Sequence, residues 1–249
     1  MIDLRRRGRG VVAVTVAMAM FPTTAAAREG SSAEAGASQS PIDIRTSDVT
    51  FVDDLPSLKF RYHTVPIEVV NTGSPDPETT IRGEVESGTT LRSNGKDYSL
   101  LQFHFHTTSE HRLDGEVFPM EMHLVHQAED GEQLVVGVWI EAGDRNRDLA
   151  PIFADLPADE TETLTIPRFD LDELIPDDDD TYRYQGSFTT PPFTEGVQWI
   201  VFDEPLEMSP GQISRFQALF PEGNSRDPQP LNDRPILSDV DDNDGDNDD

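Results

Sequence analysis

One stretch decides the fold of this chain: QFHFHTTSEHRLDGEVFPMEMHLVH, residues 102–126. In its first part, aromatic residues alternate with polar ones, a period of two that is typical of a β-strand with one packed face. We therefore expect Phe103 and Phe105 to pack into the core. Gln102, His104 and His106 are expected on the opposite face, so the alternation predicts two imidazoles that point the same way.

A turn signal, Asp114-Gly115, lies between this strand and the run MEMHLV that begins at Met120. An Asp-Gly turn can return the second run as an antiparallel neighbour of the first. Glu121 and His123 then share a face, and His123 brings a third imidazole to the first two. Three neutral nitrogens, with a fourth position left for water, are the ligand set of a catalytic zinc site.

Other interpretations of these histidines stay open at this point. A pair spaced by two residues is also compatible with two surface histidines that bind no metal. The spacing H-x-H-x3-E resembles the first cupin motif, with Glu110 as a fourth ligand, but the second cupin motif is lacking and no histidine follows His126. In the three-histidine interpretation, Gln102 and Glu121 each lie two residues from a ligand, where they are expected to accept its other ring N–H.

The rest of the chain has a hydrophobic period closer to two than to 3.6. Short runs of β-branched or aromatic residues are separated by turn signals such as Asn94-Gly95 and Asp130-Gly131, and the longest helical pattern spans Pro210 to Leu219. The sequence therefore predicts a mainly β fold, a mostly antiparallel sheet with a few short helices. The expected strands include the ranges 67–71, 100–106, 120–125, 134–141 and 197–202.

Composition excludes several classes of protein. The 249 residues contain no cysteine, which rules out a disulfide scaffold, a thiolate zinc finger and a cysteine nucleophile. Acids outnumber bases 48 to 19, giving a net charge of −29, so we expect no nucleic acid partner and no binding to an anionic membrane surface. The charge favours either a halophilic protein, kept soluble by carboxylates at high ionic strength, or simply an acidic secreted one.

The two ends of the chain differ from its middle. Residues 1–27 combine basic residues, an apolar run and the small residues Ala25 to Ala27, a signal peptide pattern. The apolar run is well short of the ~20 residues that span a bilayer, so no stable membrane anchor is expected. We expect cleavage near Ala27 and export to the periplasm or the extracellular space. Further segments are a flexible leader at 28–38, a catalytic domain at 39–236 and an acidic disordered tail at 237–249. An EF-hand loop does not fit the tail, which leaves only weak, diffuse cation binding there.

Five motifs in this order and spacing resemble those of the α-class carbonic anhydrases, over about residues 39–236. They are QSPIDI at 39–44, QFHFH with SEH at 102–111, EMHLVH at 121–126, GSFTTPPFTEGVQW at 186–199 and QPLNDR at 229–234. The resemblance implies a large twisted, mostly antiparallel sheet with zinc (Zn2+) at the floor of a conical cleft. It also implies that His104, His106 and His123 are the zinc ligands and that Gln102 and Glu121 support them.

The resemblance assigns further residues to a reaction, the reversible hydration of carbon dioxide to bicarbonate and a proton. Thr189 matches the threonine that accepts the proton of the attacking hydroxide, and Glu110 matches the glutamate that receives that threonine's own proton. Thr190 matches a residue at the bicarbonate position. An apolar wall for carbon dioxide, whose members are equally expected as core residues, comprises Val125, Val135, Phe188, Val197 and Trp199.

This sequence departs from the family pattern at three places. The shuttle histidine expected after an Asn-Gly strand end is missing, because the chain reads Asn71-Thr72-Gly73-Ser74 there. The aromatic segment that precedes QSPIDI in relatives is absent, so we expect a more open mouth. A disulfide of secreted relatives would fall at Ala33 and Phe193. Because of these departures, an alternative function stays open, that of a non-catalytic binding or mineral-interaction module.

Overall fold

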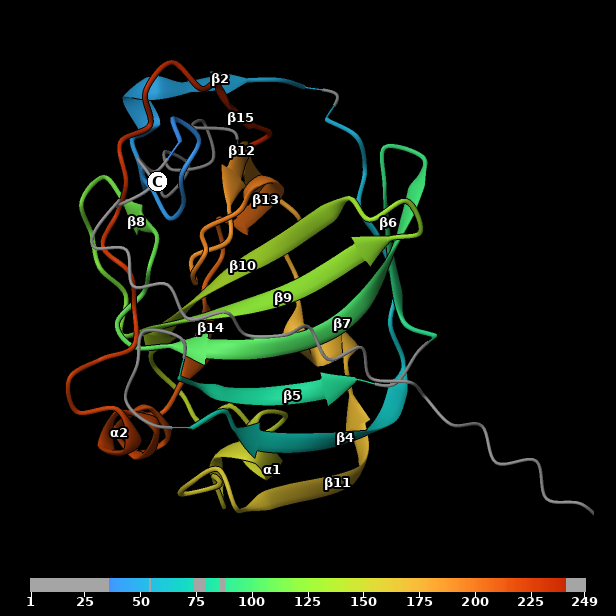
Figure 1. Cartoon of the computed structure of the whole chain (residues 1–249), viewed down its shortest axis with the longest axis vertical. Coiled ribbons are helices and arrows are strands. Elements are labelled where there is room, and N and C mark those ends of the chain that lie inside the picture. Colours follow the sequence, from blue (N-terminus) through green and yellow to red (C-terminus); the bar gives the residue numbers. More distant parts are fainter. Residues whose placement is uncertain (1–35, 54, 74–78, 86–87, 241–249) are drawn as a thin grey trace, which may run out of the picture. The chain divides into compact units, whose positions relative to one another are not determined.

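The computed structural model describes residues 36–53, 55–73, 79–85 and 88–240, and a thirteen-stranded twisted sheet dominates this part of the chain (Figure 1). Its main path runs β11-β4-β5-β7-β9-β10-β13-β12-β15-β2. A two-stranded sheet pairs β1 with β8. The strands are β1 (Asp43–Ile44), β2 (Val49–Phe51), β3 (Lys59–Arg61), β4 (Thr64–Asn71), β5 (Ile81–Val85), β6 (Thr90–Ser93), β7 (Lys96–His106), β8 (Arg112–Leu113), β9 (Met120–Ala128), β10 (Gln133–Ala142), β11 (Thr163–Asp170), β12 (Thr181–Ser187), β13 (Glu195–Phe202), β14 (Leu206–Met208) and β15 (Ile236–Ser238).

Helices are few, as predicted. In the described residues there are two α-helices, α1 (Ala150–Phe153) and α2 (Pro210–Leu219), and two short 3-10 turns at Thr46–Asp48 and Asp172–Leu174. The helix expected over Pro210 to Leu219 is confirmed. It begins with a capping box, in which the Ser209 hydroxyl accepts from the Gln212 N–H and the Gln212 side chain accepts from the Ser209 N–H.

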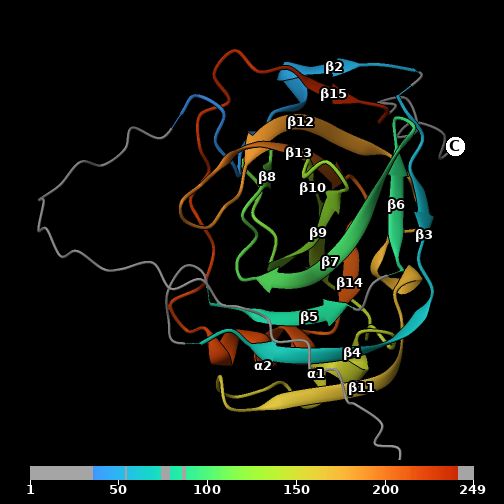
Figure 2. The same ribbon diagram turned by 45° about the vertical axis from the view of Figure 1, so that its right-hand side comes forward.

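The predicted strands and turns also form. All five expected ranges lie in strands, namely β4, β7, β9, β10 and β13. Asn94 and Gly95 both have positive φ, 48° and 78°, as an Asn-Gly hairpin turn requires, and β6 pairs with β7 across it. The hairpin from β7 to β9 is antiparallel, with His104 opposite His123. Together, β7, β9 and β10 form the centre of the sheet (Figures 1 and 2).

The sheet is mixed rather than simply antiparallel, because β10 pairs in parallel with both β13 and β14, and β15 pairs in parallel with β2. Parallel neighbours need a long crossover connection, and the chain between β10 and β13 passes through α1, β11 and β12. Turn motifs in the sequence predict only the pairing of strands that are close in sequence. The parallel pairing of strands far apart in sequence has no such local motif.

The alternation along β7 separates two environments. Phe103 and Phe105 are fully buried, and Phe105 packs edge-on against Phe153, with ring centroids 5.1 Å apart. The histidines of the same strand face the other side of the sheet, where a second core cluster contains Trp199. The aromatic face therefore anchors the strand that carries the histidines.

The folded domain extends beyond the boundary predicted at residue 236. β15 pairs with β12 and β2, and the Asp239 carboxylate accepts from the Thr181 N–H at 2.8 Å and pairs with Arg183 at 3.2 Å. The acidic composition hid this short strand. At the other end, the Ser38 N–H, placed in the leader by the sequence, donates to Glu195 at 2.8 Å. The predicted signal peptide, the start of the predicted leader and residues 241–249 lie outside the described residues. Within the described ranges, no helix is long and apolar enough to cross a membrane.

A buried histidine makes stability depend on pH. The Tyr62 hydroxyl and His126 Nε2 share a hydrogen bond of 2.5 Å, and burial lowers the pKa of His126 from 6.5 to about 4. A depressed pKa in the folded state stabilises the fold above the unfolded pKa, and this stability is lost as the pH falls from 6.5 through 4. The loss amounts to about 3 kcal/mol in total and about 2 kcal/mol between pH 7 and pH 5.

The free energy of unfolding in urea is measured at pH 7 and at pH 5. Between these two values it should fall less in His126→Phe than in the wild type. Tyr62→Phe is the matched control, because it removes the hydrogen bond but keeps the buried imidazole, and it should retain the pH dependence. Equal pH dependence in His126→Phe and the wild type would contradict the assignment.

Candidate metal centre and substrate pocket

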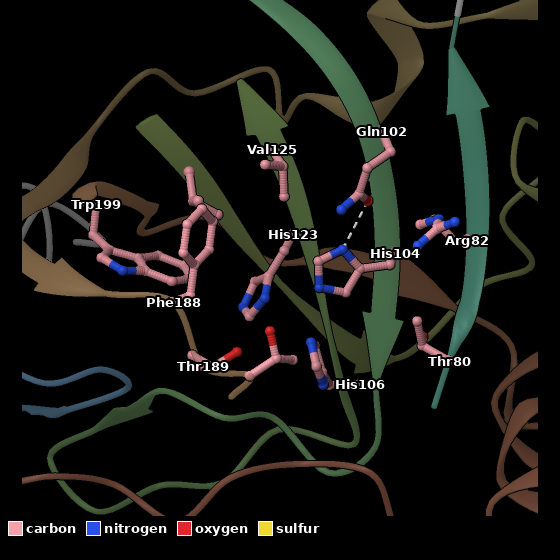
Figure 3. Close-up of a pocket in the computed structure, with 12 residues that line it drawn as sticks. Thr80, Arg82, Gln102, His104, His106, His123, Val125, Phe188, Thr189 and Trp199 are labelled. Carbon is pink, nitrogen blue, oxygen red and sulfur yellow. Dashed lines mark hydrogen bonds between the residues drawn. The ribbon is translucent and has the colours of Figure 1, made fainter. Parts of the chain in front are cut away.

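Three histidines converge where β7 and β9 lie side by side (Figure 3). The ring centroids are 4.9 Å apart for His104 and His106, 5.2 Å for His104 and His123, and 4.6 Å for His106 and His123. One nitrogen from each ring lies within 4.8 Å of the other two. This spacing suits a single metal ion bound by three imidazoles.

Each imidazole has its other nitrogen engaged by a partner. His104 Nδ1 bonds Gln102 Oε1 at 2.9 Å, and His123 Nε2 bonds Glu121 Oε1 at 2.8 Å, as the spacing predicts. His106 Nδ1 bonds the backbone carbonyl of Asn224 at 3.0 Å, a partner that sequence reasoning missed. His106 Nε2 is buried and has no hydrogen-bond partner in the described part of the chain. A buried acceptor left in this way fits a ligand atom that awaits a cation.

Burial and neighbouring charges prepare the rings for metal. Burial lowers the pKa of His106, and burial together with the charges of the other two imidazoles holds the pKa of His104 well below its usual range. Both rings are therefore neutral near pH 7, the form that binds metal. Burial also acts to lower the pKa of His123, but the charge and hydrogen bond of Glu121 outweigh it and raise that pKa. The Nε2–H that Glu121 holds stays in place when a metal binds His123 Nδ1, so only a proton on Nδ1 has to leave.

A buried chain of polar groups supports His123 from behind. Glu121 Oε1 accepts from His111 Nδ1 at 2.7 Å, and His111 Nε2 lies 2.7 Å from the Tyr184 hydroxyl, which donates to Ser40 at 2.8 Å. Burial would raise the pKa of Glu121, but the charges of His111 and His123 and their hydrogen bonds hold it well below its usual range. Sequence reasoning missed His111 as a functional residue, because its partner Tyr184 lies 73 residues away.

Glu110 and Thr189 both reach the site, but the structure records no hydrogen bond between them. Glu110 is buried, and its Oε1 accepts from the backbone N–H of Arg226 at 2.8 Å. Its Oε2 has no hydrogen-bond partner among the described residues and lies 3.8 Å from His123 Nδ1. Thr189, which is 5% exposed, lines the pocket together with Thr190. The Glu110 carboxylate expected to accept the Thr189 proton is therefore in place, but the hydrogen bond between the two side chains is not formed.

The three histidines line a cavity of about 220 Å³ with two unlike walls (Figure 3). The apolar wall contains four of the five residues that the resemblance implies: Val125, Val135, Phe188 and Trp199. Val197 is buried in the same core cluster and does not line the cavity. The polar wall holds Gln102 and two residues that sequence reasoning missed, Thr80 and Arg82.

Noncovalent contacts from Arg226 and Gln39 hold the loop that carries Thr189. The guanidinium of Arg226 lies 3.8 Å from the centroid of the Phe193 ring, and Gln39 Nε2 donates to the Phe193 carbonyl at 3.2 Å. Arg226 also donates to Gln39 Oε1 at 3.0 Å, which closes the group. At the position where the resemblance implies a cysteine, Phe193 therefore makes a cation–π contact instead. Ala33, the other expected disulfide position, lies outside the described residues.

Comparison with known proteins agrees with this geometry. A family model described as eukaryotic-type carbonic anhydrase matches residues 26–240. A carbonic anhydrase of Nostoc sp. is 36% identical over 206 residues, which cover 81% of this chain and 76% of that protein. Dioscorin dioA3 of Dioscorea japonica is 33% identical over 208 residues, 81% of this chain and 76% of that protein.

A solved structure is also similar to this chain in fold and sequence. The α-carbonic anhydrase of Thermovibrio ammonificans in complex with sulfanilamide has a TM-score of 0.77 and 36% identity, covering 82% of this chain and 88% of that one. The fold, the histidine triad and the family match agree over the same part of the chain. This chain belongs to the eukaryotic-type carbonic anhydrase family.

Proposed function

We propose that this chain uses zinc to interconvert carbon dioxide with bicarbonate and a proton. The observation that supports the proposal best is the triad of His104, His106 and His123, in which each ring has one nitrogen engaged and His106 Nε2 is a buried acceptor without a partner. A closed structural zinc site uses four protein ligands, whereas three histidines leave one position open for water or substrate. When bound, zinc supplies the Lewis acidity that makes hydroxide available near neutral pH.

The residues of the pocket then orient the reactants. Glu110 is a buried carboxylate whose Oε2 is available to a hydroxyl donor. If the Thr189 hydroxyl donates to it, Thr189 Oγ can only accept from the attacking oxygen, and that direction aims a lone pair at the substrate carbon. Carbon dioxide is uncharged and rests against the wall of Val125, Phe188 and Trp199, while Thr190 lies where bicarbonate forms.

A second candidate function is a non-catalytic binding module. It is favoured by the dioscorin relatives, one of which has been solved as a complex with ascorbate and is 30% identical with a TM-score of 0.74. The complete histidine triad favours the enzyme. Stopped-flow hydration of carbon dioxide by the purified protein, with zinc content measured on the same sample, tests the proposal. A zinc-loaded protein without hydration activity would favour the binding module.

Proton export is expected to depend on buffer. Among the described residues, the histidines that line the cavity are the three proposed ligands themselves, and Ser74, near the expected shuttle position, lies outside the described ranges. Buffer or water must then carry the proton out. We expect imidazole to raise kcat at saturating carbon dioxide and to change kcat/KM much less, because attack on carbon dioxide does not involve the shuttle. High turnover that is flat across imidazole concentrations would indicate an internal shuttle elsewhere.

We also propose export and adaptation to high salt. The signal peptide pattern of residues 1–27 supports export, and the net charge of −29 supports the adaptation. Self-repulsion is screened at molar salt, where the Debye length falls to ~3 Å, so the melting temperature should rise from dilute buffer to molar sodium chloride. Sucrose is the control, because it screens no charge. A melting temperature independent of salt would refute the adaptation.

A further inference from the structure

Arg82 places a positive charge inside the pocket. Among the described residues that line the cavity, it is the one lysine or arginine, and it lies on β5 directly opposite His104 on β7. Figure 3 shows its guanidinium beside His104, on the far side of the histidines from Phe188 and Trp199. Arg82 therefore brings a cation to the polar wall of the cavity, next to the three histidines.

A neighbouring carboxylate fixes the orientation of this guanidinium. Arg82 Nε and Nη2 both donate to Glu84 Oε1, at 2.8 and 2.5 Å, and the Arg82 side chain is 38% exposed. Its Nη1 donates no hydrogen bond to the described residues. Gln102 Oε1 is engaged by His104, so the amide group that remains available on Gln102 is a donor. Two donors on one wall, one of them charged, match an anion.

The rest of the molecule is strongly acidic, so a fixed cation in the cavity favours an anionic ligand there. With a net charge of −29, the surface repels bicarbonate and other anions on approach. Surface carboxylates farther than the Debye length of ~8 Å are screened at physiological ionic strength, whereas Arg82 lines the cavity itself. A planar guanidinium also matches the flat geometry of carboxylates and bicarbonate.

We propose that Arg82 and Gln102 form a subsite for small monovalent anions of the carboxylate type, on the polar wall opposite Phe188 and Trp199. The subsite deepens the proposed function, on which it rests for its natural ligand, since bicarbonate is the anionic product of hydration. Glu84 holds Arg82 in place and offsets part of its charge, so binding is expected to be weak enough for the product to leave.

Acetate is the probe, and its dissociation constant is measured by NMR titration on the metal-free and on the zinc-loaded protein. Arg82→Gln should weaken acetate binding about tenfold in both forms, the scale of one charge-assisted hydrogen bond, and Arg82→Lys should recover part of the loss. Arg92→Gln is the matched control. It removes the same net charge at a position where Arg92 pairs with Asp97 on the surface, and it should leave acetate binding unchanged.

Equal acetate affinities in Arg82→Gln and Arg92→Gln would overturn the subsite. The same titration separates this proposal from the proposed function. Loss of acetate binding in Arg82→Gln, in a wild-type protein that takes up zinc but shows no hydration of carbon dioxide, would leave the subsite standing and refute the enzyme. If the wild type hydrates carbon dioxide normally and Arg82→Gln does not change acetate binding, the enzyme stands and the subsite is refuted.

Discussion

Replacing any one of His104, His106 and His123 with alanine is expected to remove both the bound zinc and the hydration of carbon dioxide, leaving the uncatalysed rate. Each ring contributes one of only three protein nitrogens, and a site reduced to two holds zinc far more weakly. Zinc content by mass spectrometry and hydration by stopped flow, on the same preparations, measure the two losses together.

The matched control for these substitutions is His63→Ala. His63 is exposed, outside the cavity and between β3 and β4, so its removal should change neither zinc content nor rate. Circular dichroism of each variant separates loss of metal from loss of fold. Full hydration activity in a triad variant that contains no metal would end the zinc assignment.

Thr189→Ala is expected to keep zinc and lose activity by ~10²-fold or more, the scale for removing one orienting group in a catalytic site. Thr189 lines the cavity but is not among the residues that can hold the metal. Thr189→Ser retains a hydroxyl and should keep most of the rate. Wild-type turnover in Thr189→Ala at full zinc occupancy would show that no such orienting group acts here.

A double-mutant cycle with Glu110→Gln decides whether the two residues act as a unit. Glu110 Oε2 is buried without a hydrogen-bond partner among the described residues, so the cycle tests whether Thr189 donates to it. Residues in one relay show strongly non-additive losses, because removing either one already removes the orientation. Additive losses would mean that Glu110 acts through its other contacts, which are the backbone N–H of Arg226 and the rings of His106 and His123.

Local signals were enough to predict the core of the fold and the convergence of the three histidines. The alternation along β7 and the turn at Asp114-Gly115 place His104 opposite His123, and no distant contact is needed for that register. Gln102 and Glu121 follow from the same period of two. The capping box of α2 is likewise a pattern within four residues of chain.

Features that join distant parts of the chain were not predictable in the same way. The parallel pairing of β10 with β13 and the bond from His106 to the Asn224 carbonyl arise only when segments far apart in sequence meet, and a backbone carbonyl carries no residue-type signal. Arg82 was missed because its strand, β5, follows residues 74–78, where the sequence has no family motif to set the register. The short strand β15 was masked by the acidic residues that follow it.

The histidine triad and the group formed by the Thr189 loop and Glu110 differ in how far apart their contacting residues lie in the sequence. This difference sets the order in which the two groups assemble. The three histidines proposed as ligands lie on two antiparallel strands, β7 and β9, joined by residues 107–119, whereas the contacts that seat the Thr189 loop and Glu110 join residues 147 and 116 positions apart. Closing a long loop costs more entropy and is slower than closing a hairpin. A refolding chain should therefore capture zinc before it can turn over substrate, and the ion would then serve as a template around which the distant segments dock.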